Sequence, residues 1–471
     1  MVRSDQEPEV GIEPTTCCLQ DSCSSQLSYP GGACTDRSVS PDRTASSDVV
    51  GQIRHEDDHP QVAGNAPVRC PTVTDATDIF IGDELLAEAE ERAGGLSDLG
   101  TGQFLEGLGR FVDSLNGDAR LNDIGRYIAR ERILLHTVNR LNYVHDRERL
   151  PEISAVDVVK PVFIIGLPRT GTTILHDILN QDPANRAPLT WELMFPSPPP
   201  EAAAGNDDPR VAACQATLPD GDLQATMFKA MHPMGATLSQ ECVVMMGEAM
   251  CTPLFHNQFR VPDYQDWVDN GADWSAVYEF HRRQLQHLWS HKPGDRWMLK
   301  TGAHMWGLAE LLATYPDARI VFTHRDPVKS MTSYASLTTL VRSLGSDDVD
   351  PIEIAEDWTA RLKMMLGRSM AVRAAREYPD AIFYDMYFSD FVADQFAEVE
   401  KIYDAIDLPM SVAGSTAMRQ FIADNPKGKD GIHRYEPSEF GVDPAKVRRD
   451  FAPYIDRFGF EPEASSTSGK P

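Results

Sequence analysis

From residue 162 onward, short apolar runs alternate with longer segments in which apolar residues recur at spacings of three and four. The short runs predict β-strands at residues 162–165, 297–300, 319–323 and 381–384. The longer segments predict helices at residues 173–180, 304–313, 328–337, 351–377 and 395–406. Because short buried strands that alternate with helices are typical of parallel sheets, this part of the chain is predicted to form an α/β fold around a mostly parallel sheet.

The preceding segment shows helical periodicity only. It predicts three helices, at residues 84–93, 104–115 and 123–142. The third helix carries four arginines away from its apolar face, and these are Arg126, Arg130, Arg132 and Arg140. They either shape the entrance to a substrate site or form the solvated face of a packing helix.

The two ends of the chain lack this patterning. Residues 1–72 are rich in Ser, Pro, Gly, Asp and Cys and are predicted to be a disordered extension, and residues 463–471 a disordered tail. A start site assigned too far upstream would also produce such an extension. We expect the remainder to divide into an N-terminal helical region, residues 73–155, and a main α/β domain, residues 156–462.

Composition excludes several classes of partner. The formal net charge of −27 disfavours nucleic acid and other polyanions, unless a local basic pocket receives them. Five of the 8 cysteines lie within the first 70 residues, at spacings that do not fit a zinc motif. No apolar run approaches the ~20 residues that span a bilayer, and no apolar signal core follows the N-terminus. We therefore expect a cytoplasmic protein; peripheral membrane contact and the oligomeric state stay open.

The loop after the first predicted strand carries the most informative motif. Gly166 and Gly171 keep the G-x-x-x-x-G frame of a phosphate-binding loop, and the N-terminus of the following helix lies behind it. Where a P-loop NTPase has the lysine that holds the β- and γ-phosphates, this chain has Thr172. The positive charge is instead inside the loop, at Arg169. The sequence therefore predicts an anion site for something other than a nucleoside triphosphate.

Three further segments carry basic and hydroxyl residues, at residues 296–304, 319–333 and 425–435. The first two follow predicted strands. Because the carboxyl ends of parallel strands meet at one edge of a sheet, these two segments are expected to converge with the glycine-framed loop.

With these four segments in this order, the chain resembles sulfotransferases that use 3′-phosphoadenosine 5′-phosphosulfate (PAPS) as donor, over roughly residues 120–460. The resemblance implies a P-loop NTPase-like three-layer fold with an N-terminal helical extension, and makes residues 156–462 a sulfotransferase domain. It implies in-line transfer of a sulfuryl group from PAPS to a hydroxyl of a small or lipid-like acceptor. Adenosine 3′,5′-bisphosphate would be the second product, and no metal would be required.

The resemblance also assigns the donor site. The P-loop-like segment matches the family's 5′-phosphosulfate site, and Arg325 and Ser333 keep the spacing of the residues that contact the 3′-phosphate. A basic, glycine-containing loop near the C-terminus matches a further donor contact. The expected donor-binding residues are Gly166, Pro168, Arg169, Thr170, Gly171, Thr172, Thr173, Arg325, Ser333, Lys427, Gly428 and Lys429. A donor with an anion at each end of an adenosine needs two such sites.

Catalysis needs positive charge at the leaving oxygen and a base at the acceptor hydroxyl. Arg169 and the strand-terminal Lys300, which is followed by Thr301, are expected to supply the charge. Three residues are candidates for the base: Glu192 first, then His304, then Glu241.

Two other functions compete with sulfuryl transfer. A P-loop kinase or NTPase is opposed by the missing lysine and by the absence of an acidic residue at the end of the strands predicted at 297–300 and 319–323. A catalytically silent nucleotide-binding protein would keep the fold without turnover. Separately, residues 226–259 are dense in Met and Phe, which predicts either an adaptable pocket for a lipophilic acceptor or helix core.

Overall fold

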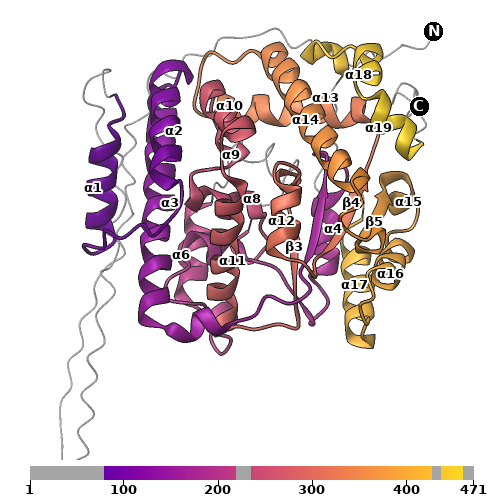
Figure 1. Ribbon diagram of the computed structural model, residues 1–471, viewed down its shortest axis with the longest axis horizontal. Coiled ribbons are helices and arrows are strands. Elements are labelled where there is room, and N and C mark those ends of the chain that lie inside the picture. The colour runs from indigo at the N-terminus through magenta and orange to yellow at the C-terminus, as the bar shows by residue number, and fades with distance from the viewer. Residues whose placement is uncertain (1–78, 219–234, 427–435, 460–471) are drawn as a thin grey trace, which may run out of the picture. The chain divides into compact units, whose positions relative to one another are not determined.

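The computed structural model describes residues 79–218, 235–426 and 436–459 (Figure 1). The extension and tail predicted at residues 1–72 and 463–471 lie outside these ranges. So do the candidate donor contacts Lys427, Gly428 and Lys429.

A five-stranded sheet forms the centre of the described chain, and all of its neighbouring strands are parallel. The strands are β1 (Val162–Gly166), β2 (Asn185–Arg186), β3 (Arg296–Lys300), β4 (Arg319–His324) and β5 (Phe383–Tyr387). Their order in the sheet is β2-β3-β1-β4-β5, so β1 is central and β3 and β4 flank it. The predicted α/β fold with a parallel sheet is confirmed.

Helices cover the sheet and extend beyond it at the N-terminal side (Figure 1). The first three are α1 (Gly82–Arg92), α2 (Phe104–Asp118) and α3 (Asp123–Arg149). Those that follow up to β3 are α4 (Thr172–Leu179), α5 (Thr190–Met194), α6 (Pro209–Thr217), α8 (Cys242–Met245), α9 (Pro253–Gln258), α10 (Pro262–Asn270) and α11 (Trp274–Ser290). The later ones are α12 (Leu308–Thr314), α13 (Pro327–Ser343), α14 (Pro351–Ala374), α15 (Phe388–Ala393), α16 (Gln395–Ala405), α17 (Val412–Asp424), α18 (Pro444–Asp450) and α19 (Ala452–Phe458).

Side chains of the central strand alternate between two hydrophobic cores, as the period of two in a strand requires. Phe163 and Ile165 lie in the larger core, with residues of α2, α3, α11, α12 and α14. Val162 and Ile164 lie in the smaller core, with residues of α4, α16 and α17. The sheet is therefore sandwiched between helical layers, as the resemblance implied.

The fifth strand runs later than the 381–384 predicted, because it accommodates a carboxylate. Asp385 Oδ1 lies 2.8 Å from His324 Nε2, and Arg373 donates to the same oxygen at 2.7 Å. These two partners let an acidic residue stand inside a strand where the sequence indicates a strand end.

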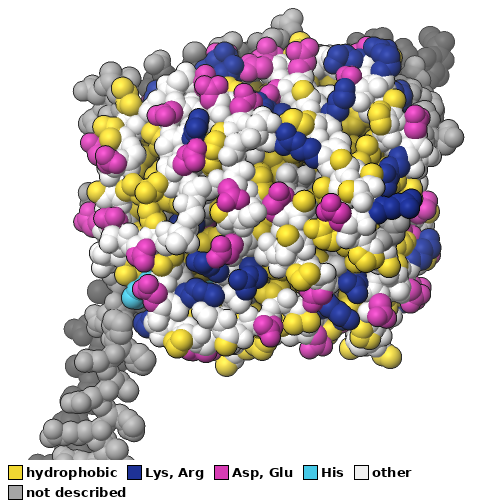
Figure 2. All heavy atoms as spheres, in the orientation of Figure 1, with side chains coloured by type: hydrophobic (Ala, Val, Ile, Leu, Met, Phe, Trp, Pro, Cys, Tyr) yellow, Lys and Arg dark blue, Asp and Glu magenta, His cyan; other side chains and the backbone are white. Residues whose placement is uncertain are grey.

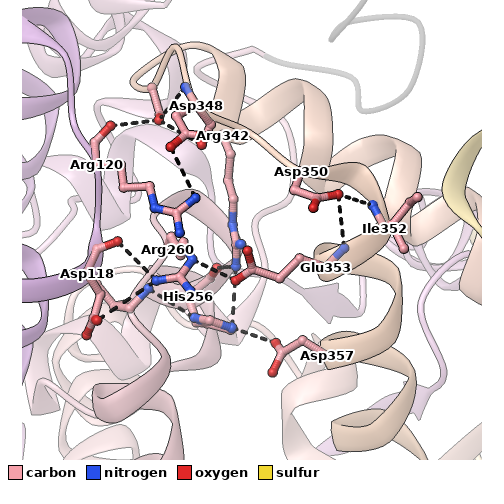
Figure 3. Close-up of polar contacts among 12 residues, drawn as sticks. Asp118, Arg120, His256, Arg260, Arg342, Asp348, Asp350, Ile352, Glu353 and Asp357 are labelled. Carbon is pink, nitrogen blue, oxygen red and sulfur yellow. Dashed lines mark hydrogen bonds and ion pairs between the residues drawn. The ribbon is translucent and has the colours of Figure 1, made fainter.

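Charged side chains join the loop after α2 to the region around α9, α10 and α14 (Figure 3). Arg260 donates from Nε to Glu353 at 2.6 Å and from Nη1 to the carbonyl of Asp118 at 3.2 Å. Close by, His256 Nε2 lies 2.7 Å from Asp357 Oδ2. On the face shown in Figure 2, acidic and basic side chains are interspersed, so that face offers no continuous basic surface to a polyanion.

The N-terminus of helix α3 packs backbone against backbone on the turn after α13. The amide of Asn122 donates to the carbonyl of Gly345 at 3.0 Å, and a Cβ added at Gly125 would collide with that same carbonyl oxygen. Only glycine fits at position 125 without moving the turn after α13.

Gly125→Ala is therefore expected to lower the free energy of unfolding by about 3 kcal/mol, the upper range for overpacking. Urea denaturation measures the change. Gly109→Ala in α2 is the matched control, because nothing lies within 4 Å of its added Cβ and alanine should stabilise the helix by about 0.5–1 kcal/mol. Equal stabilities of the two variants would contradict the close approach.

Candidate functional site

The carboxyl ends of β1, β3 and β4 lie side by side at one edge of the sheet. Ile164 of β1 is in register with Lys300 of β3, and Gly166 of β1 with Thr323 of β4. The loops that follow these strands therefore start next to one another, as the sequence predicts.

The glycine-framed loop after β1 is a tight turn into α4. Gly166 and Gly171 have φ of +145° and +89°. A Cβ at Gly166 would also collide with Thr323 on β4. Arg169 adopts a left-handed φ of +66°, which is unusual for a residue with a side chain. This backbone opens onto the N-terminus of α4, where amide groups favour an anion.

A cavity of about 650 Å³ opens beside this loop. Eight of the predicted donor-binding residues line it, and they are Gly166, Pro168, Arg169, Gly171, Thr172, Thr173, Arg325 and Ser333. Thr170 lies beneath the loop instead, where its hydroxyl donates to the carbonyl of Leu167 at 2.7 Å and lies 2.5 Å from the Thr323 hydroxyl. The structure thus brings the two predicted anion sites together in one cavity.

The two arginines of these sites are linked. Arg325 donates from Nη1 to the carbonyl of Arg169 at 2.8 Å, and Arg169 donates from Nε to the hydroxyl of Ser333 at 3.2 Å. The Arg325 guanidinium lies 4.0 Å from the centre of the Phe388 ring, within cation–π range. Phe388 also lines the cavity, and the sequence analysis did not predict it as a site residue. The one sequence feature that could have indicated it is its position directly after the end of β5.

A lysine–carboxylate pair lies where β3 ends. Lys300 is 2% exposed, and its ammonium donates to Thr173 Oγ1 at 3.1 Å and lies 2.5 Å from Glu241 Oε1. Glu241 and Asp177 are the carboxylates among the described residues that line the cavity, and Ser239 donates to Asp177 at 2.5 Å. A buried cation and a carboxylate thus lie together beside the anion cradle.

The structure places Glu192, the first choice for the base, away from the cavity. Its side chain is fully buried and accepts from Arg186 at 3.1 and 3.2 Å, from Lys292 at 2.9 Å and from the amide of Leu189 at 3.1 Å. Both carboxylate oxygens serve this network, which caps α5. This placement speaks against Glu192 as the base.

His304, the second choice, is also directed away from the cavity. It is fully buried, its Nδ1 lies 3.0 Å from the Tyr278 hydroxyl, and its ring packs edge-on against Phe163 in the larger core. Burial holds the pKa of His304 well below its ordinary value. Glu241, the third choice, is the one of the three candidates that lines the cavity.

Away from the lysine–carboxylate pair, the cavity wall is largely apolar. Its apolar residues include Leu135, Leu193, Met194, Leu238, Val243, Val244, Leu254, Leu337, Trp358 and Leu362. Within the Met- and Phe-rich stretch, the described residues Met245, Met246, Met250, Phe255 and Phe259 belong to the larger core. For that part of the stretch, the helix-core alternative is the right one.

In residues 79–218, 235–426 and 436–459, no group of three His, Cys, Asp or Glu side chains is placed to hold a metal ion. Among the same residues, no helix combines the length and the apolar character needed to cross a membrane.

The chain is similar in sequence and structure to known sulfotransferases. The sequence profile of the sulfotransferase family matches residues 161–412. The solved structure of sulfotransferase STF1 from Mycobacterium tuberculosis H37Rv is 30% identical, covers 80% of this chain and 99% of its own, and superposes with a TM-score of 0.70. Sulfotransferase STF9 from Mycobacterium avium is 28% identical, with coverage of 82% and 99% and a TM-score of 0.75.

A further sulfotransferase is similar over part of the chain. It is the omega-hydroxy-beta-dihydromenaquinone-9 sulfotransferase Stf3 of Mycobacterium bovis, which is 22% identical over 313 residues, or 64% of this chain and 75% of the relative. Its name states an acceptor that is a lipid with a terminal hydroxyl.

Proposed function

Because this chain belongs to the sulfotransferase family, we propose that it transfers a sulfuryl group from PAPS to a hydroxyl of a lipid-like acceptor. One observation carries the proposal. A single cavity is lined by a P-loop-like anion cradle, by a second arginine with a serine, and by Glu241, which pairs with the buried Lys300. No P-loop lysine is present for a nucleoside triphosphate, which disfavours the kinase alternative.

In the proposed complex, the loop amides and Arg169 hold the 5′-phosphosulfate at the start of α4. Arg325 and Ser333 hold the 3′-phosphate, and the ring of Phe388 fixes the plane of the Arg325 guanidinium. Each hydrogen bond to a charged group contributes about 1.5–3 kcal/mol, so two or three of them select strongly for a nucleotide that carries the 3′-phosphate.

The chain's own residues suit an in-line transfer. Glu241 takes the proton from the acceptor hydroxyl, whose oxygen forms a bond to sulfur. The bond between sulfur and the bridging phosphate oxygen breaks, and the negative charge that develops on this oxygen is stabilised by Lys300 and Arg169. Adenosine 3′,5′-bisphosphate leaves. The 2.5 Å contact between Glu241 and Lys300 supports this assignment, because it places the buried cation directly against a carboxylate that lines the cavity.

The acceptor is proposed to be an apolar molecule with a free hydroxyl. The apolar wall and the volume of about 650 Å³ suit a lipid-sized ligand. The relative Stf3, whose named acceptor is a hydroxylated lipid quinone, supports the same class.

Arg325→Met tests the donor site. We expect it to raise the Kd for adenosine 3′,5′-bisphosphate about 10- to 100-fold, because it removes a charge-assisted contact to the 3′-phosphate. Calorimetric titration measures the Kd. Arg319→Met, at the opposite end of β4, is the matched control and should bind the nucleotide as the wild type does.

Thermal stabilisation separates the competing functions. Adenosine 3′,5′-bisphosphate should raise the Tm by mass action, and ATP with magnesium should raise it much less. The reverse ranking would favour a kinase or NTPase. Strong stabilisation by the bisphosphate with no turnover of any hydroxyl compound would favour a silent nucleotide-binding protein.

A further inference from the structure

The arginines of α3 do not form one solvated face, as one of the sequence interpretations held. Arg130 pairs with Glu88 and, at 3.2 Å, with Glu131. Arg140 is buried and donates to the carbonyl of Leu99 at 2.6 Å and to that of Glu248 at 2.8 Å. Both arginines have protein partners that account for their positions.

Arg132 differs from both. It lines the 650 Å³ cavity together with Leu135 of the same helix (α3 in Figure 1). Its Nε is buried and has no hydrogen-bond partner among the described residues. Within the same residues, no carboxylate comes within ion-pair distance of its guanidinium. The cavity therefore contains a positive charge for which the described protein supplies no direct partner.

Glu248 is the acidic residue whose charge acts on Arg132, but its oxygens serve other groups. Oε1 lies 3.2 Å from His136 Nδ1 and accepts from Asn139 at 3.4 Å, and Oε2 accepts from Gln284 at 3.1 Å. Burial lowers the pKa of the Arg132 guanidinium, and attraction to Glu248 only opposes this effect. The long-range charge of Glu248 does not replace a hydrogen-bonded partner.

This unpaired charge constrains what can fill the cavity. Before an acceptor binds, water can solvate the guanidinium. An apolar acceptor would displace that water, and burying a charged group without a partner costs several kcal/mol. An acceptor that places an oxyanion against Arg132 removes this cost and gains charge-assisted hydrogen bonds.

We propose that Arg132 is a specificity-determining residue that binds an anionic group of the acceptor, so that the substrate is an amphipathic hydroxyl compound bearing a carboxylate, phosphate or similar oxyanion. The sulfuryl-accepting hydroxyl lies at the Glu241 end of the cavity and the oxyanion at Arg132, with the apolar part of the molecule between them. This inference rests on the proposed function, because it concerns the acceptor of the same site.

Binding of matched probes tests the inference independently of turnover. The probes are ω-hydroxy fatty acids from ω-hydroxyhexanoate to ω-hydroxyhexadecanoate and their methyl esters, titrated into protein saturated with adenosine 3′,5′-bisphosphate. We expect at least one acid to bind the wild type about 10- to 100-fold more tightly than its ester, as a charge-assisted contact implies. Arg132→Met should remove this preference, and Arg132→Lys should keep part of it.

Arg130→Met is the matched control, because Arg130 lies on the same helix, does not line the cavity and should leave the preference intact. The inference is overturned if acids and esters bind the wild type equally, if neither binds at any length, or if Arg132→Met keeps the preference. Assays with PAPS separate this result from the proposed function. An acid preference without sulfation of any probe would support the anion site and count against these probes as acceptors, while sulfation without an acid preference would support the proposed function and overturn the anion site.

Discussion

Glu241→Gln is expected to lower kcat by about 10²–10⁴-fold, the usual contribution of a general base. The amide cannot take the proton of the acceptor hydroxyl, but it keeps the size of the side chain and can still contact Lys300. Donor binding should change little, because Glu241 is proposed to act on the acceptor. Steady-state kinetics with PAPS and any hydroxyl compound that the wild type sulfates measure the effect.

Asp177→Asn is the matched control, because Asp177 also lines the cavity and its carboxylate accepts from Ser239. It should retain most of the turnover. If Asp177→Asn loses activity while Glu241→Gln keeps it, the base is Asp177. If instead Glu192→Gln abolishes turnover in a stably folded protein, the first choice from the sequence is restored.

Acidification is expected to destabilise the protein well above the pH at which carboxylates titrate. Burial lowers the pKa of His281 to about 3 and those of His176, His256 and His287 to about 4, from an ordinary value of 6.5. Below pH 6.5 the unfolded chain binds a proton at each of these histidines, while the folded protein remains neutral until about pH 4. Lowering the pH through this window therefore favours the unfolded state.

Each of these four histidines should cost about 1.4 kcal/mol per pH unit within the window. Together they should remove roughly 4 kcal/mol between about pH 6.5 and 5.5, against a typical stability of ~5–15 kcal/mol. Urea unfolding midpoints across this range measure the slope. His281→Asn should reduce it by about one proton, because asparagine can keep the contact with Tyr315 without titrating. A stability profile that stays flat across this range would contradict the whole explanation.

The main strands and the P-loop-like turn could be predicted from the sequence because their signals are local. Residues Val162 to Gly171 contain both the apolar run and the glycines that the turn requires. The two-residue β2 was missed, since a segment of that length has no periodicity to detect. The fifth strand was misplaced because Asp385 reads as a strand end until its partners His324 and Arg373 are known.

The placement of the three candidate bases could not be predicted from the sequence for a different reason. Glu192 and His304 lie close along the chain to the loop and to Lys300, but chain proximity does not say which way a side chain points. Glu192 is buried in an ion pair with Arg186. His304 packs against Phe163 and lies within hydrogen-bond distance of the Tyr278 hydroxyl. The contact between Glu241 and Lys300 joins distant parts of the chain, so no local pattern shows it.

The division of labour around the cavity has an evolutionary consequence. The proposed donor contacts stand mainly where parallel strands end, and their spacing follows the fixed separation of neighbouring strands, about 4.8 Å. The rest of the cavity wall includes side chains of α3, α13, α14 and the segments around α5 and α8. Mutations in this part of the wall can change which alcohols the protein accepts without altering how it binds the sulfuryl donor. One scaffold can therefore diversify into enzymes with many different acceptors.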